Sequence, residues 1–171
     1  MRNWLGLVAV LLSVGVATAE KPSQTGVVSE AGRYSVVFPT KPAKTDSEKK
    51  LATAGGNLTV VTSRTESSSV VYSVTYTDYP PSFKEVSASE LLKGVINGMK
   101  GNDGIVSGEA DFEVPGGSGR VFTITAGDNL VRGKVALAGN RLYLVQVSGK
   151  KDAAKEKAAD EFLTSFVLSA K

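Results

Sequence analysis

Cysteine and histidine are both absent from this chain of 171 residues. Without cysteine, the protein can form no disulfide and has no thiolate nucleophile. Without histidine, it has neither the base of a Ser-His-Asp triad nor an imidazole ligand for a metal ion. We therefore expect no cofactor and no metal site, and we expect stability to come from a hydrophobic core alone.

A large excess of either charge is also missing. The chain carries 20 basic and 17 acidic residues, which leaves a formal net charge of +3. The basic residues are scattered along the sequence, whereas nucleic-acid-binding domains concentrate them in a patch or stripe. The composition therefore predicts no nucleic-acid partner and leaves a protein or a small ligand as the expected partner.

The N-terminal residues 1–19 have the pattern of a secretory signal peptide. Arg2 provides a basic start, Trp4–Val16 is an apolar run, and residues 17–19 are the small residues of a cleavage site. The uncharged stretch is shorter than the roughly 20 apolar residues that a membrane-spanning helix needs. We predict cleavage after Ala19, a secreted or periplasmic protein, and no stable membrane span after cleavage.

Beyond the signal peptide, the chain reads as a short tether followed by one domain. Residues 20–31 are mostly polar and contain Pro22, which favours an extended, mobile segment. Alternating apolar residues and Gly- or Asn-rich turns then predict short strands, and two amphipathic patterns predict helices. The predicted strands span residues 33–38, 49–53, 58–63, 70–76, 104–114, 119–126, 130–138 and 141–148, with helices over 87–100 and from Asp152 onward.

This order of elements, strands followed by a helix in each half, predicts an α+β fold for residues 32–171. Short connections between the last four strands indicate an antiparallel meander. We expect a central antiparallel β-sheet flanked by two main helices, in the arrangement of an α/β/α sandwich.

The first predicted helix has a specific start signal. Ser87 and Glu90 have the spacing of a capping box, in which each side chain bonds the backbone N–H of the other residue. Gly94 and Gly98 lie about one turn apart in this helix, where each costs about 1 kcal/mol relative to alanine. We expect the two glycines to let the helix approach the sheet closely.

Three carboxylates alternate along one predicted strand, at Glu109, Asp111 and Glu113. Their side chains project from one face of the strand, where they can hold Ca²⁺ or provide a general acid and base. The outer two lie about 13 Å apart along the strand, which is too far for one small ion without other ligands. The alternative is a solvated face with cross-strand partners among the basic residues Arg120, Arg132 and Lys134.

The end of strand 70–76 is the candidate binding surface. Tyr76, Asp78 and Tyr79 precede two prolines and form a stiff segment with apolar faces and polar tips, as protein interfaces often have. The alternative is that Tyr76 packs in the core and Asp78 starts the turn. Arg141 and Tyr143 follow a Gly-Asn turn, and there we expect the aromatic ring to pack in the core.

Several segments together resemble small secreted bacterial proteins of the PsbP-like and DcrB-like fold group. The resemblance rests on residues 33–42, Tyr76–Pro80, 139–143 and 162–166, and it covers about residues 30–168. It implies a central antiparallel sheet flanked by helices, and a binding or assembly factor with no catalytic residue. No photosynthetic role is carried over. DcrB-like proteins are often lipoproteins, and this chain lacks the cysteine that such an anchor requires.

From the residues and the resemblance together, we expect an exported, non-catalytic binding or accessory module of the cell envelope. Two alternatives stay open. One is a glycan hydrolase that depends on carboxylates alone, with the three acidic residues of strand 104–114 as its acid and base. The other is a carrier that holds a small molecule or a lipid between the sheet and a helix.

Overall fold

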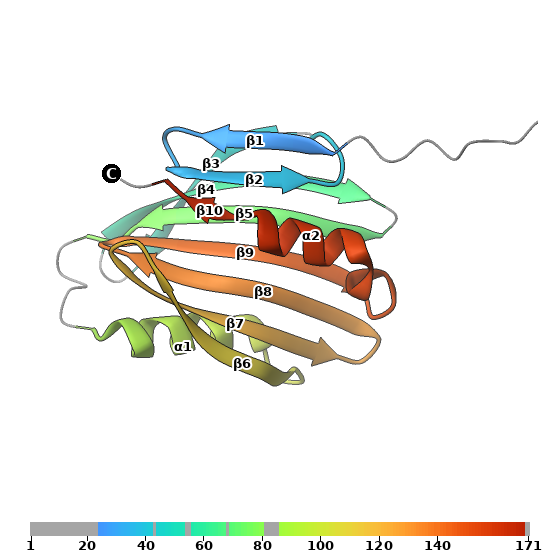
Figure 1. The fold of residues 1–171 in the computed structure, drawn as a ribbon. Helices are drawn as coiled ribbons and strands as arrows, with labels where there is room; N and C mark the ends of the chain where they lie inside the picture. The colour runs from blue at the N-terminus through green and yellow to red at the C-terminus, as the bar shows by residue number, and fades with distance from the viewer. Residues whose placement is uncertain (1–23, 43, 54–55, 68, 81–85, 170–171) are drawn as a thin grey trace, which may run out of the picture.

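The computed structural model describes residues 24–42, 44–53, 56–67, 69–80 and 86–169 (Figure 1). The predicted signal peptide, residues 1–19, and the first residues of the predicted tether lie outside these ranges. The described chain contains two antiparallel sheets, two α-helices and one short 3-10 helix.

The larger sheet has seven antiparallel strands in the order β3-β4-β5-β9-β8-β7-β6. Successive strands pair from β3 to β5 and again from β6 to β9, which confirms the predicted meander after the first helix. Pairing of β5 with β9 joins the two halves of the chain into one sheet. The strands are β3 (Lys44–Thr53), β4 (Gly56–Ser67), β5 (Val70–Asp78), β6 (Ile105–Val114), β7 (Gly117–Ala126), β8 (Asn129–Ala138) and β9 (Arg141–Lys150).

A second, smaller sheet has the order β1-β2-β10. It consists of β1 (Thr25–Ser29), β2 (Tyr34–Phe38) and β10 (Val167–Leu168). The predicted tether, residues 20–31, includes β1, which pairs with β2 along its whole length. Part of the predicted tether therefore belongs to the folded domain, because Val27 packs against the core and ties β1 to it.

The two helices are short and lie on opposite faces of the larger sheet (Figure 1). α1 (Ala88–Lys100) packs against β7 and β8, and the predicted capping box of Ser87 and Glu90 is confirmed. α2 (Lys157–Ser165) packs against β2 and β9. It starts later than predicted, because the 3-10 helix η2 (Ala153–Lys155) occupies the residues after Asp152.

The predicted central sheet flanked by two main helices, an α/β/α sandwich, is therefore wrong. Strands make up most of the described chain, and the smaller sheet together with α2 covers one face of the larger sheet. The error has a physical source. β10 has only two residues, too few to show alternation of apolar and polar side chains, and β1 lies within a mostly polar segment that indicates a tether.

The larger sheet buries apolar side chains on both faces, because alternate residues of a strand point to opposite sides. On one face, Tyr72 of β5 and Val145 of β9 belong to a core that includes Phe162 of α2. On the other face, Leu142 of β9 belongs to a second core with Ile96 of α1. β9 therefore connects the two cores.

The two glycines of α1 do not bring the helix close to the sheet, contrary to the prediction. Both residues are exposed. A Cβ atom placed on Gly94 or Gly98 meets no atom within 4 Å beyond its immediate neighbours and the helix's own backbone. The space for a methyl group is therefore already present at both positions.

We expect Gly94→Ala to raise the free energy of unfolding by up to about 1 kcal/mol, because alanine loses less backbone entropy than glycine in a helix. Thermal or urea unfolding measures this change. Gly104→Ala is the opposite control, since its Cβ would lie 2.3 Å from the Lys100 carbonyl oxygen and should destabilise the protein. A lower melting temperature for Gly94→Ala would contradict the expectation.

Candidate functional site

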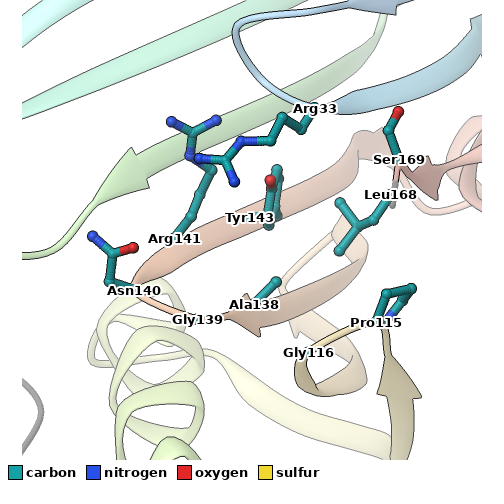
Figure 2. Close-up of a pocket in the computed structure, with 10 residues that line it drawn as sticks. All are labelled: Arg33, Pro115, Gly116, Ala138, Gly139, Asn140, Arg141, Tyr143, Leu168 and Ser169. Carbon is teal, nitrogen blue, oxygen red and sulfur yellow. The ribbon is translucent and has the colours of Figure 1, made fainter. Parts of the chain in front are cut away.

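A pocket at one end of the sheets is the candidate functional site (Figure 2). Its walls come from the β1–β2, β6–β7 and β8–β9 turns and from the C-terminal strand, which are remote from one another in sequence. The volume is about 280 Å³, which suits a single side chain or a small organic acid. The lining residues are Arg33, Pro115, Gly116, Ala138, Gly139, Asn140, Arg141, Tyr143, Leu168 and Ser169.

Backbone hydrogen bonds tie the turns of this pocket together. The Gly139 N–H donates to the Gly116 carbonyl at 3.1 Å, and the Ser169 N–H donates to the Arg33 carbonyl at 3.0 Å. Gly116 and Gly139 have φ angles of +75° and +63°, which glycine adopts without a Cβ clash. The rim of the pocket is therefore held in place by the main chain, although turns form most of it.

The Arg141 guanidinium is fully engaged at the edge of the pocket. It donates two hydrogen bonds of 2.6 Å to the Asp78 carboxylate and another to the Ala31 carbonyl. Its Cζ atom lies 4.7 Å from the centroid of the Tyr76 ring, a cation–π arrangement. Arg141 needs these partners because only 9% of the residue is exposed, and an unpaired buried charge is costly. The hydrogen bonds from Arg141 hold the pKa of Asp78 below its usual value.

Tyr143 forms part of the pocket wall and is almost fully buried. Its hydroxyl donates to the Gly32 carbonyl at 2.9 Å, and its ring contacts the rings of Tyr76 and Phe166. Burial raises the pKa of Tyr143, so the phenol is neutral at physiological pH. The expectation that this ring packs in the core is confirmed, and its hydroxyl fixes the β1–β2 turn above the pocket.

Arg33 is the exposed cation of the pocket. No ion pair to its guanidinium is found within the part of the chain that the structure describes. Its φ angle is +55°, a left-handed conformation that costs a residue with a Cβ about 1–2 kcal/mol. Figure 2 shows the side chain extending from the turn toward Arg141. A strained residue that presents a cation beside a cavity suggests a binding role.

The predicted binding residues Tyr76, Asp78 and Tyr79 lie next to this pocket but do not line it. Tyr76 belongs to the core, and Asp78 is paired with Arg141. Tyr79 is half-buried and packs against the core beneath α1, and its N–H donates to the Asn140 carbonyl at 2.8 Å. All three residues thus contact residues that line the pocket: Tyr76 and Asp78 contact Arg141, and Tyr79 bonds Asn140. Their part in binding stays a prediction.

The acidic residues of β6 form a surface charge pair instead of a site with facing carboxylates. Glu109, Asp111 and Glu113 are exposed on an edge strand of the larger sheet. Arg120 of β7 lies 2.7 Å from Asp111 and 3.5 Å from Glu109, which is the cross-strand alternative. Across the described ranges, no three acidic side chains converge closely enough to hold a metal ion. The calcium hypothesis therefore has no support here.

Sequence reasoning did not identify Arg33 as a functional residue. It predicted Arg33 as the first residue of a strand, whereas the residue closes the β1–β2 turn through a hydrogen bond from its N–H to the Glu30 carbonyl. The only local signal was Gly32 beside it, which marks a turn. Nothing in the local sequence places this turn beside the β8–β9 turn, more than 100 residues away.

Comparison with known proteins bears on the fold. No family model matches the chain, and no curated protein matches it. Among solved structures, the chain is similar to the solution structure of cyanobacterial PsbP (CyanoP) from Synechocystis sp. PCC 6803, with a TM-score of 0.51 and 13% sequence identity. The match covers 95% of this chain and 99% of that chain. The predicted PsbP-like fold is thereby confirmed at the level of fold alone.

The helices also bear on the membrane prediction. None of those in the described ranges has both the length and the apolar character that crossing a bilayer requires.

Proposed function

We propose that this chain is an exported, non-catalytic binding module of the cell envelope, and that its pocket receives an acidic side chain of a partner protein. The contrast between two neighbouring arginines carries this proposal. Arg141 forms the direct ion pair with Asp78, whereas the exposed Arg33 guanidinium acts on Asp78 only at longer range and forms no direct ion pair among the described residues. A carboxylate in the pocket can accept paired, charge-assisted hydrogen bonds from Arg33.

The remaining lining of the pocket fits the same ligand chemistry. Asn140 and Ser169 add polar groups, while Pro115 and Leu168 provide apolar contact for the carbon stem of an acidic side chain. The pocket is too small for a folded domain, so it is expected to anchor one side chain within a larger contact. Tyr79, whose N–H donates to the Asn140 carbonyl at the pocket, stays a candidate for that larger contact.

The two alternative functions have less support. A carboxylate-dependent hydrolase needs an acid and a base on either side of a bound sugar, but Arg120 already pairs with two of the three carboxylates of β6. A lipid carrier needs an apolar cavity between sheet and helix. The cleft beside α1 is lined in part by Asp111, Glu113 and Arg120, whose charges disfavour a lipid tail.

Export rests on the signal-peptide pattern of residues 1–19. Mass spectrometry of the protein from fractionated cells tests it. A mature N-terminus at Glu20 outside the cytoplasm supports export, and retention of Met1 in the cytoplasm contradicts it.

The binding proposal predicts that Arg33→Gly weakens binding of a blocked glutamate, acetyl-Glu-amide, by about tenfold, since hydrogen bonds to a charged group contribute about 1.5–3 kcal/mol. The same substitution should leave stability unchanged or raise it by about 1 kcal/mol, because glycine adopts the positive φ without strain. Chemical shifts of the ¹⁵N-labelled protein measure binding, and urea unfolding measures stability.

Ser69→Gly is the matched control for this variant. Ser69 is another exposed residue with positive φ (+71°), in the turn before β5, and its replacement should gain stability without changing binding. Acetyl-Gln-amide controls for the charge of the probe. Equal binding of acetyl-Glu-amide by Arg33→Gly and the unchanged protein would contradict the proposed site.

A further inference from the structure

One side of β8 forms a surface that the helices leave partly uncovered. α2 and the smaller sheet lie over β5 and β9, while β8 and β7 continue beyond them (Figure 1). Alternate side chains point to this face of β8. They are Leu130 and Ala136, which are buried, and Arg132, Lys134 and Ala138, which are partly exposed. Ala138 lines the pocket that contains Arg33, so this face of β8 leads directly out of the candidate site.

A second cleft lies at the far end of the same face. Its volume is about 440 Å³. Arg132, Lys151 and Lys155 contribute positive charge to it, and the neighbouring strand β7 contributes two threonine hydroxyls. Leu130 also lines this cleft, and Ala138 lines the pocket. Eight residue steps separate these two, or about 26 Å at about 3.3 Å per residue.

Lys134 lies between the two cavities on this face. Its Nζ lies 6.0 Å from the centroid of the Phe112 ring, and the ring packs directly over Gly119, where a Cβ would lie 2.3 Å from ring carbon Cζ. Burial lowers the pKa of Lys134, and no ion pair to it is found in the described part of the chain. A carboxylate brought next to Lys134 would offset the loss of water around its ammonium group.

Acidic residues balance only part of this positive surface. Asp160 of α2 pairs with Arg132 at 2.6 Å. Lys151 and Lys155 have no ion pair within the described ranges, although Asp152 and Glu156 follow them in the sequence. The three lysines on this surface thus remain available to an external anion, in line with the Arg33 pocket.

We propose that the partner contributes an extended acidic segment of about nine residues, which runs along β8 from the Arg33 pocket to the cleft at Lys151 and Lys155. This inference rests on the proposed function and names the form of its partner. Charge complementarity between an acidic peptide and this surface supports it. Arg33 and three lysines that form no ion pair among the described residues line one path. A peptide is favoured because Phe112 and Ala138 are partly exposed beside the cations and can contact apolar side chains between the acidic ones.

A peptide-length series tests the inference. The probes are blocked peptides in which glutamate alternates with alanine, about three and about nine residues long, and a matched peptide with glutamine in place of glutamate. We expect the long acidic peptide to bind about tenfold more tightly than the short one, which corresponds to one or two added charge contacts. Higher salt should reduce this difference, because the added contacts are ionic.

Charge-neutral variants identify the path. Lys134→Gln combined with Lys155→Gln should weaken the long peptide by about tenfold and leave the short one nearly unchanged. Lys49→Gln combined with Lys50→Gln removes the same charge from exposed positions of β3 and should change binding of the long peptide less than about twofold. Lys134→Arg keeps the positive charge, so with Lys155 unchanged this variant should bind the long peptide as the natural protein does. Circular dichroism checks that the fold is unchanged.

Each outcome decides the inference. Equal binding of the two peptide lengths, or equal loss in the β3 control, would overturn it. Two other polyanions test the choice of a peptide: polygalacturonate, and vesicles of phosphatidylcholine and phosphatidylglycerol. If either binds more tightly than the long peptide and depends on the same lysines, the partner is not a peptide. If Arg33→Gly alone abolishes binding of both lengths, the proposed function stands and this inference fails. If Arg33→Gly has no effect on either length, the proposed function fails.

Discussion

Phe162→Ala is expected to lower the free energy of unfolding by about 4 kcal/mol, the cost typical of removing a fully buried phenylalanine side chain. Phe162 of α2 is 1% exposed, and its ring lies between two others. The ring centroids of Phe38 and Tyr72 are 5.0 and 5.4 Å away. Because Phe38 belongs to the smaller sheet and Tyr72 to the larger one, this one side chain joins both sheets to α2, and no single neighbour can fill the cavity.

Urea unfolding followed by circular dichroism measures this loss. Phe162→Leu is the control, since it keeps most of the apolar volume and should cost clearly less than the alanine variant. Hydrogen exchange adds a local measurement. The amides of β2 should lose protection in Phe162→Ala more than those of β7, which lies outside this contact. A loss below about 2 kcal/mol would indicate that the smaller sheet is held mainly by other contacts.

Asp78→Ala is the second large effect, expected to cost about 2–3 kcal/mol. Removing one partner of a buried ion pair costs about 3–5 kcal/mol, and we place this pair lower because the Asp78 side chain is half exposed. The variant leaves the Arg141 guanidinium, with 11% of its side chain exposed, without its carboxylate. Asp78→Asn should recover part of the loss, because the amide oxygen still accepts one hydrogen bond.

The pH dependence of this difference follows from the pKa of Asp78. Hydrogen bonds from Arg141 lower that pKa in the folded state. The charged carboxylate therefore contributes its full stabilisation at pH values above the pKa of an aspartate in the unfolded chain, about 3.9. It is lost as the pH falls through the folded pKa. The stability difference between the natural protein and Asp78→Ala should therefore be constant from about pH 7 to pH 5 and shrink below about pH 4.

Asp103→Ala is the matched control for charge, because Asp103 is an exposed carboxylate in the loop after α1. Its stability should differ from that of the natural protein by less than about 0.5 kcal/mol. A difference for Asp78→Ala that stays constant down to about pH 2 would contradict the role of the charged carboxylate. The remaining loss would then come from packing alone.

Local signals in the sequence predicted a large part of the fold. The capping box of Ser87 and Glu90 and the alternation of β5 operate over a few residues, so one short segment contains all the information. The turns between β6 and β9 are equally local, because a Gly- or Asn-rich connection of two or three residues forces antiparallel neighbours. These predictions match the structure to within a few residues.

The candidate site was predicted less completely. Tyr76, Asp78 and Tyr79 were placed at a surface, and they lie beside the pocket, but their partners come from β9 and from the β1–β2 turn. The carboxylates of β6 illustrate the opposite case. Their spacing on one strand face is a local property, and so is the cross-strand pairing with Arg120 that the hairpin imposes.

The sequence by itself therefore determined that this chain has no thiol or imidazole groups, where most strands and α1 begin and end, and that the strands after α1 form a meander. The tertiary structure alone decided that β1, β2 and β10 form a second sheet and that Arg33 meets the β8–β9 turn. The physical reason is the range of the interactions. Caps, turns and alternation act between near neighbours, whereas pairing of β10 with β2 joins segments about 130 residues apart through contacts that no short segment encodes.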